Sequence, residues 1–198
     1  MVVDPLNLTQ VILAEGNKQV NTTTNQIRTK YKNPKILAEA AIFIALATAL
    51  SQIVIYVMPQ GGSITLASMV PIIWLALRRG PKVGIATGVI YGIIQFMLLP
   101  YAIDPLQVLF DYPLAFAALG LAAFFPNKPI LGATVAITGR FLMHFTSGAI
   151  WWAPIFAPSI NPIAYSSIYN GSYLLPELVI SGIMLYMLQK SRVLKVYL

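Results

Sequence analysis

Apolar residues follow one another in long segments through most of this chain, and short breaks containing proline, glycine or asparagine separate the segments. A helix that crosses a membrane needs roughly 20 predominantly apolar residues. From residue 36 onward the pattern predicts six such helices, at about 36–57, 64–78, 82–99, 105–125, 129–151 and 163–188. We therefore expect an all-α integral membrane protein built as a six-transmembrane-helix bundle.

The composition also indicates a membrane protein. Of the 198 residues, 58% are hydrophobic and 10% are charged, and the mean hydropathy is +0.74; soluble domains have more charge and fewer apolar residues. The chain contains no cysteine, which excludes a thiolate nucleophile, a disulfide-exchange enzyme and a cysteine-ligated metal site.

Residues 1–35 differ from the rest because they are polar and rich in Asn and Thr. We expect them to form a poorly ordered cytosolic extension, partly helical near residues 5–15, and we expect residues 36–198 to form the membrane domain. No chemistry is assigned to the extension.

Basic residues occur in alternate breaks between the predicted helices. The breaks MPQGGS, PYAID and APIFAPSINP contain no Lys or Arg, whereas the others and the two ends carry Arg28, Lys30, Lys32, Lys35, Arg78, Arg79, Lys82, Lys128, Lys190, Arg192 and Lys195. Because Lys and Arg favour the cytosolic side, we expect both termini in the cytosol. Topology thus explains the net charge of +7 without a nucleic-acid partner.

Several polar and aromatic residues fall within three of the predicted helices at one depth. Counting about 1.5 Å per helical residue places them near the outer face: Asp111, Tyr112, His144, Trp151, Trp152, Tyr165 and Asn170. The tryptophans and Tyr165 also suit an interfacial aromatic belt, and His144 also suits a structural hydrogen bond.

Asp111 has no such simple alternative. A carboxylate in the hydrocarbon costs on the order of 2.5–3.5 kcal/mol, and no basic residue is expected in the outer half to pair with it. Arg140 and Glu177 are expected to neutralise one another deeper in the membrane. An unpaired carboxylate beside aromatic rings, an imidazole and an amide suits a small, flat, cationic heteroaromatic ligand.

Small residues repeat at four-residue spacing in two helices. Gly84, Gly88 and Gly92 form one stripe, which we interpret as close packing within the bundle. A second stripe consists of Ala41, Ala45 and Ala49; packing and contact with a partner protein are equally open for it.

Four stretches together resemble the thiamine-specific substrate-binding (S) component of energy-coupling factor transporters: SITLASMVPIIWLALRRGPKVGIATGVIYGIIQF, LFDYPLAFAALGLAAFF, RFLMHFTSGAIWW and NPIAYSSIYNGS. The resemblance extends over about residues 36–188. It implies a multi-pass protein of a prokaryotic plasma membrane that holds thiamine near the outer face. It also implies association with a transmembrane coupling protein and two ATPase subunits.

The family's EYP, HFxxGxxxW and YSxxxNG motifs imply the substrate-binding residues Asp111, Tyr112, His144, Gly148, Trp152, Tyr165 and Asn170. His144 and Trp152 would sandwich the pyrimidine, and the remaining polar groups would contact the amine, the ring nitrogens or the thiazolium. The partner interface would be the stripe of Ala41, Ala45 and Ala49.

Two positions depart from the family pattern. Asp111 replaces a glutamate, and Gly62 stands where the family has a tryptophan. A lost indole removes a stacking surface of about 1–2 kcal/mol, for which Trp151 or Tyr101 would be the substitute. Affinity, or the choice among thiamine relatives, is expected to differ accordingly.

Other functions are weighed against thiamine binding. One is an S component for hydroxymethylpyrimidine, riboflavin or biotin. A membrane hydrolase or metalloenzyme would need a second histidine or a paired acid beside His144, and a structural scaffold would leave the cost of Asp111 unexplained. No GxxxxGK[ST] phosphate loop occurs, so partners would hydrolyse ATP. We expect no enzyme, no catalytic residue, no metal and no cofactor.

Overall fold

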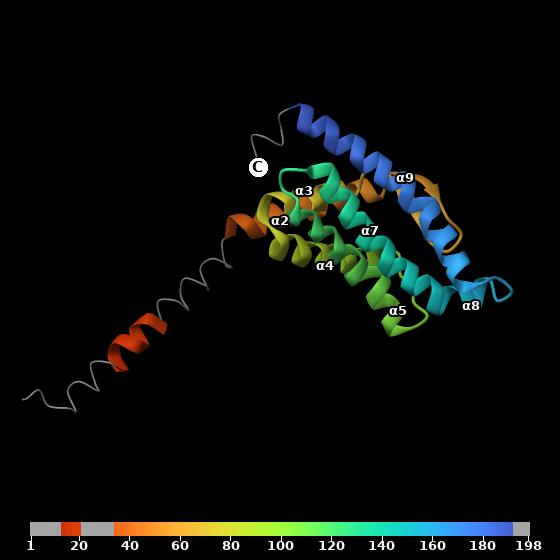
Figure 1. The fold of residues 1–198 in the computed structure, drawn as a ribbon, viewed down its shortest axis with the longest axis horizontal. Coiled ribbons are helices and arrows are strands. Elements are labelled where there is room, and N and C mark those ends of the chain that lie inside the picture. The colour runs from red at the N-terminus through yellow and green to blue at the C-terminus, as the bar shows by residue number, and fades with distance from the viewer. Residues whose placement is uncertain (1–12, 21–33, 192–198) are drawn as a thin grey trace, which may run out of the picture. The chain divides into compact units, whose positions relative to one another are not determined.

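The computed structural model describes residues 13–20 and 34–191 (Figure 1). The chain divides into two compact units, residues 1–39 and 40–198. In the first unit, residues 13–20 are helical. Most of the predicted N-terminal extension, including residues 1–12 and 21–33, lies outside the described residues.

The described chain is mostly helical. Its elements, in order, are α2 (Pro34–Ser51), β1 (Val54–Val57), β2 (Ser63–Thr65), α3 (Val70–Arg79), α4 (Pro81–Leu98), α5 (Pro105–Leu109), η1 (Phe110–Leu114), α6 (Ala115–Ala117), η2 (Ala118–Phe124), α7 (Pro129–Ser147), η3 (Gly148–Trp152), α8 (Ala153–Phe156) and α9 (Pro162–Lys190). The segments α5 to η2 follow one another directly, as do α7 to α8. Proline occupies the first turn of α3, α4, α5, α7 and α9, where its missing N–H has no intrahelical partner to lose.

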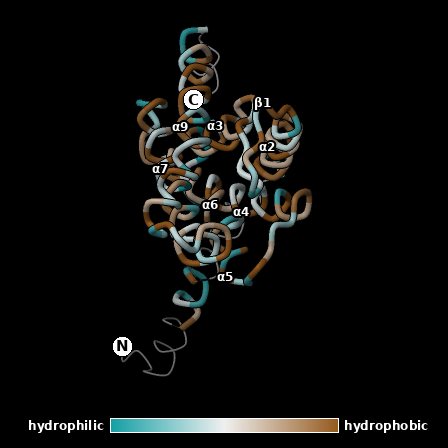
Figure 2. The backbone as a smooth tube through the Cα atoms, turned by 90° about the vertical axis from the view of Figure 1, so that its right-hand side faces the viewer, coloured by the Kyte–Doolittle hydropathy of each residue, from teal (hydrophilic) through white to brown (hydrophobic). Residues whose placement is uncertain are grey.

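Four helical segments among the described residues are long and apolar enough to cross a membrane. They are Pro34–Ser51, Pro81–Leu98, Pro105–Phe124 and Pro162–Lys190, and Figure 2 shows hydrophobic positions along these helices. By contrast, α3 has only 10 residues, which span about 15 Å. The helix predicted at 64–78 therefore begins too early, because α3 starts only at Val70.

The first predicted helix, 36–57, extends too far. The helix ends at Ser51, and Val54–Val57 pairs antiparallel with Ser63–Thr65 as a short hairpin. The run from Ile53 to Val57, which consists of four β-branched residues and a tyrosine, favours a strand. Gly61 supplies the positive φ of 88° that the turn requires. The fold is helical with one small hairpin rather than all-α.

The glycine stripe of α4 lies against the segment that follows it in the chain. A Cβ on Gly88 would contact the backbone of Phe116 and Ala117, and one on Gly92 would contact the backbone of Tyr112 and Pro113. The interpretation of this stripe as close packing is confirmed. The alanine stripe differs, because Ala41, Ala45 and Ala49 are all exposed on α2.

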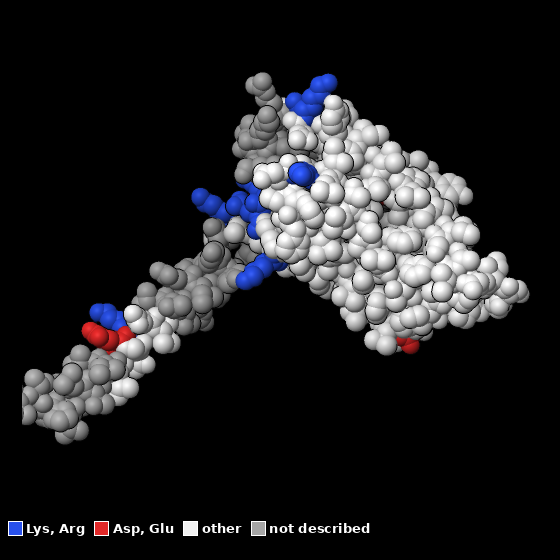
Figure 3. All heavy atoms as spheres, viewed as in Figure 1, with Lys and Arg blue, Asp and Glu red and all other residues white. Residues whose placement is uncertain are grey.

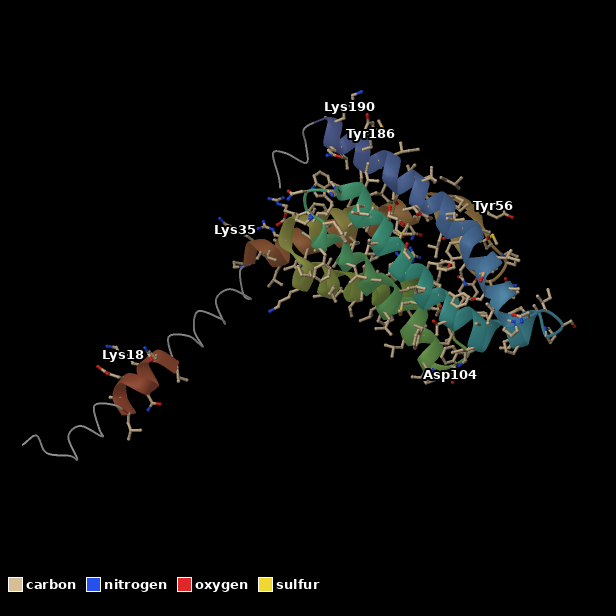
Figure 4. All side chains as sticks on the ribbon, viewed as in Figure 1. Lys18, Lys35, Tyr56, Asp104, Tyr186 and Lys190 are labelled. Carbon is tan, nitrogen blue, oxygen red and sulfur yellow. The ribbon has the colours of Figure 1, made fainter. Side chains whose placement is uncertain are left out.

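Charged side chains of the second unit are separated along its length. Figure 3 shows the Lys and Arg side chains on the visible face of this unit gathered toward one end, and Figure 4 labels Lys190 at that end and Asp104 at the other. Asp104 caps α5 by accepting a hydrogen bond from the Leu106 N–H at 2.8 Å. The basic end therefore contains the end of α9, and the opposite end contains the α4–α5 connection.

Candidate functional site

A cavity of about 120 Å³ lies in the second unit, on the side of the hairpin and the α4–α5 connection. Seven of the eight predicted substrate-binding residues line it: Asp111, Tyr112, His144, Gly148, Trp152, Tyr165 and Asn170. Trp151 does not line it; its ring packs against Phe110 at a centroid distance of 6.0 Å. The depth counted along the predicted helices thus groups residues from three helices that also lie together in the fold.

Two wide helical turns carry four of these residues. Phe110–Leu114 and Gly148–Trp152 are both π-helical turns, in which one extra residue is inserted into the helix. Such turns commonly occur at functional sites because they redirect side chains. Here they present Asp111 and Tyr112 from one segment, and Gly148 and Trp152 from the other.

The Asp111 carboxylate is a hydrogen-bonding centre. Oδ2 accepts from Gln107 Nε2 at 2.7 Å, Ser147 Oγ at 2.7 Å and Trp152 Nε1 at 2.9 Å, while Oδ1 contacts His144 Nδ1 at 3.0 Å. Among the described residues no Lys or Arg is recorded against this carboxylate, in line with the expectation, but the carboxylate is held by four other side chains. Four donors offset the loss of water around this carboxylate, and its side chain is only 13% exposed.

The predicted ion pair between Arg140 and Glu177 is not formed. Arg140 Nε donates to His144 Nε2 at 3.2 Å, and the guanidinium carbon lies 4.2 Å from the centroid of the Phe116 ring. Glu177 instead accepts from the backbone N–H and hydroxyl of Thr65 at the end of β2. Each charge thus has a partner of its own: an imidazole nitrogen and an aromatic ring for Arg140, and Thr65 for Glu177 Oε1.

Asn170 joins α9 to the end of α7. Its Nδ2 donates to the His144 carbonyl at 3.2 Å and to the Ser166 carbonyl at 3.0 Å, and its Oδ1 accepts from the Tyr173 hydroxyl at 3.0 Å. Gly148 permits this close approach, because a Cβ there would collide with Ser166 Oγ and lie 3.0 Å from Asn170 Nδ2. The amide therefore has a structural function beside any contact with a ligand.

Aromatic rings form much of the cavity wall. Tyr165 and Tyr169 stack at 5.9 Å with an interplanar angle of 12°, and Trp152 meets Tyr101 edge to face at 6.4 Å. The Tyr165 hydroxyl is buried without a hydrogen-bond partner, which leaves it available to a ligand. Of the two proposed substitutes for the missing indole, Tyr101 lines the cavity and Trp151 does not.

The hairpin turn borders the cavity and leaves no room for a side chain at residue 62. A Cβ on Gly62 would lie 2.8 Å from the Tyr173 ring and 3.1 Å from the Tyr169 hydroxyl. The Gly62 N–H donates to that hydroxyl at 3.1 Å. A Cβ on Gly61 would lie even closer to the Tyr101 ring. Tyrosines from elsewhere in the chain thus occupy the space beside these two glycines.

Several cavity or supporting residues escaped the sequence analysis. Gln107 and Ser147 are fully buried and hold Asp111, and Tyr169 and Tyr173 line the cavity. Gln107 lies one helical turn before Asp111, a spacing that places the two on one face and would have identified it. Among the described residues, no group of three or more His, Asp or Glu side chains is arranged to hold a metal ion.

These features define a class: a helical membrane protein that encloses a polar and aromatic cavity suited to a small molecule. Comparison with known proteins then gives the family. The sequence model of the thiamine transporter protein family (Thia_YuaJ) matches residues 37–196, and the chain belongs to this family. Because the family consists of transporters, the prediction that the chain is not an enzyme is confirmed.

Individual relatives agree with this assignment. The thiamine transporter ThiT of Bacillus subtilis is 33% identical over 172 residues, covering 77% of this chain and 88% of the relative. ThiT of Lacticaseibacillus paracasei is 26% identical over 168 residues, covering 72% and 80%. A solved structure of ThiT from Listeria monocytogenes superposes with a TM-score of 0.73 at 25% identity, covering 81% of this chain and 96% of that one.

Proposed function

We propose that this chain is the thiamine-binding S component of an ATP-driven energy-coupling factor importer in the plasma membrane of a prokaryote. It binds thiamine from outside and delivers it with the help of a transmembrane coupling protein and two ATPase subunits. The observation that carries the proposal is the cavity that contains Asp111, His144 and Trp152 together, in a chain that belongs to the thiamine transporter family.

The cavity offers separate groups to the two rings of thiamine. The Trp152 indole is held in place by its hydrogen bond to Asp111, so its face is pre-oriented for a flat ring. His144 takes the opposite side of the aminopyrimidine. Asp111 Oδ1, which has one protein donor, accepts from the exocyclic amine, and the free Tyr165 hydroxyl meets a ring nitrogen or the thiazolium substituent.

The positions of the charges support the proposed topology. Lys190 and the basic ends of α3 and α4 favour the cytosol, while Asp104 marks the outer end. In this orientation the six helices of the bundle are α2, α3, α4, α5–η2, α7–α8 and α9, of which α3 crosses only part of the membrane. Both termini are cytosolic, and the cavity opens near the outer face. The exposed stripe of Ala41, Ala45 and Ala49 contacts the coupling protein.

A second vitamin-binding function has one observation in its favour. Gly62 and Asp111 both depart from the family pattern within the cavity, and hydroxymethylpyrimidine retains only the half of thiamine that His144 and Trp152 would contact. This ligand lacks the permanent thiazolium charge. Competition between thiamine and hydroxymethylpyrimidine distinguishes the two functions.

Titration of the purified protein with thiamine, followed by tryptophan fluorescence, tests the proposal. Stacking on Trp152 should quench the emission, and Asp111→Asn should weaken binding by about 10–100-fold, because hydrogen bonds to a charged group are worth roughly 1.5–3 kcal/mol. Asp104→Asn is the matched control: Asp104 caps α5 outside the cavity, and asparagine also caps helices. Wild-type protein that fails to bind thiamine would reject the proposed ligand.

A further inference from the structure

We propose that Arg140 is a positioning residue that holds His144 neutral, with its proton on Nδ1, so that a ligand can meet only the face of the imidazole ring. This inference deepens the proposed function and rests on it for the identity of the ligand. Its geometric basis is the hydrogen-bonded series Arg140–His144–Asp111, which connects α7 to the π-helical turn η1.

The direction of each hydrogen bond in this series follows from the chemistry of its first member. An arginine Nε always carries hydrogen and can only donate. Arg140 Nε points at His144 Nε2 at 3.2 Å, so Nε2 must accept with its lone pair and carries no proton. A neutral imidazole then has its single proton on Nδ1, which faces Asp111 Oδ1 at 3.0 Å. Both contacts are satisfied only in this tautomer.

Arg140 is itself fixed in place. It lies four residues before His144 on α7, a spacing at which helical side chains are neighbours. Its guanidinium also lies over the Phe116 ring, 4.2 Å from Cζ to the centroid, a favourable cation–π arrangement. The donor therefore has little freedom to leave Nε2.

The groups facing His144 leave no site for a second proton. Asp111 faces it from η1 and accepts from Nδ1, and Arg140 faces it from its own helix and donates to Nε2. The Tyr173 ring of α9 lies at 70° to the imidazole ring, with 6.2 Å between the ring centroids. Protonation of Nε2 would place its N–H against the arginine N–H. Arg140 thus carries one positive charge, His144 is neutral and Asp111 carries one negative charge, so the net charge of the three is zero.

This charge state matters for a cationic ligand. Histidine is the side chain that ordinarily changes charge between about pH 5 and pH 8, and an imidazolium in the cavity wall would repel a thiazolium. With both nitrogens engaged in the ring plane, His144 offers its π face to a flat ring instead of a hydrogen bond. Arg140 also lines the cavity, but the charge of Asp111 balances its own, so a neutral His144 keeps the cavity wall free of net positive charge over the physiological range of pH.

The first test uses wild-type protein alone. His144 is the only histidine in the chain, so protein labelled with ¹⁵N-histidine gives one pair of imidazole signals in detergent or nanodiscs. We expect a pyrrole-type Nδ1 and a pyridine-type Nε2, unchanged between about pH 8 and about pH 6. A protonated Nε2, alone or together with Nδ1, overturns the inference. No ligand is added, so this result does not depend on thiamine binding.

The second test compares Arg140→Met with Arg140→Lys. Methionine removes the donor, so His144 can take up a second proton; thiamine affinity should then fall by about ten-fold between about pH 8 and about pH 6, as expected for one added charge near the ligand. Lysine can still donate and should restore the pH profile of the wild-type protein. The wild-type profile also serves as the reference for any protonation of thiamine itself over this pH range. A flat profile in Arg140→Met overturns the role of Arg140. Absence of thiamine binding by wild-type protein would refute the proposed function instead. If Arg140→Met does not fold, the ¹⁵N spectra of wild-type and Arg140→Lys protein decide whether His144 is neutral.

Discussion

Replacing Gly148 with alanine should loosen the junction on which the cavity depends. Gly148 begins the π-helical turn η3 and faces α9. An added Cβ would overlap Ser166 Oγ and lie 3.0 Å from Asn170 Nδ2. Both side chains are engaged: Ser166 Oγ donates to the Phe145 carbonyl at 2.7 Å, and Asn170 donates to the His144 carbonyl. Neither can move away without giving up a hydrogen bond.

The size of the effect can be worked from these contacts. Overpacking by one methyl group costs about 1–3 kcal/mol, and a lost hydrogen bond costs about 1 kcal/mol. Alanine recovers about 0.5–1 kcal/mol because it restricts the unfolded chain more than glycine does. The net destabilisation is about 2 kcal/mol, which lowers the Tm of a chain of this size by roughly 4–8 °C. Thiamine affinity should fall as well, since Gly148 and Asn170 line the cavity.

A thermal unfolding assay in detergent measures this prediction, with Gly182→Ala as the matched control. Gly182 lies within α9, and a Cβ there would meet no atom within 4 Å. The same substitution should therefore stabilise the protein by about 0.5–1 kcal/mol. If Gly148→Ala proves as stable as Gly182→Ala, the close approach of α9 to η3 is not the feature that requires glycine.

Three further substitutions test other parts of the site. Gly61→Ala introduces a side chain at a φ of 88° and against the Tyr101 ring, so it should cost about 1–2 kcal/mol and weaken thiamine binding; equal affinity would contradict a contribution of the hairpin. Glu177→Ala leaves the buried Thr65 N–H without its acceptor and should lower stability by about 1–3 kcal/mol, seen as a lower Tm. Asp104→Ala removes the cap of α5 and should lower the stability by about 1 kcal/mol while thiamine affinity stays unchanged. A loss of affinity would indicate that Asp104 contacts the ligand directly.

The helices could be predicted from sequence because apolar segments and proline breaks are both strong signals. Pro81, Pro105, Pro129 and Pro162 each start a helix at or beside a break that the sequence predicts. The hairpin could not be separated from the first helix by hydrophobicity, since Ile53–Val57 is apolar throughout and periodicity does not distinguish a short buried helix from a strand. Its β-branched composition was the available signal.

The candidate site could be predicted at the level of residues but not of partners. Depth along the helices grouped His144 with Asp111 and Trp152, because that grouping depends only on helical rise. Hydrogen-bond partners depend on rotation about each helix axis, which the two π-helical turns change. For this reason the Arg140–Glu177 pair was wrong, and the contact of Arg140 with His144 was missed although the two residues lie four apart.

The contacts of Asp111 alter the physical account of how this site would hold a cation. An unpaired carboxylate would attract a cation by being neutralised, and it would be costly in the empty protein. Asp111 has four donors, so the empty cavity is already stable. One of the donors is the Trp152 indole, which this hydrogen bond holds in place. Its charge then acts on a ligand mainly through orientation: it sets the planes of two rings between which a flat cation fits, at little reorganisation cost. Substitutions that keep the charge but move the carboxylate should therefore impair binding nearly as much as substitutions that remove it.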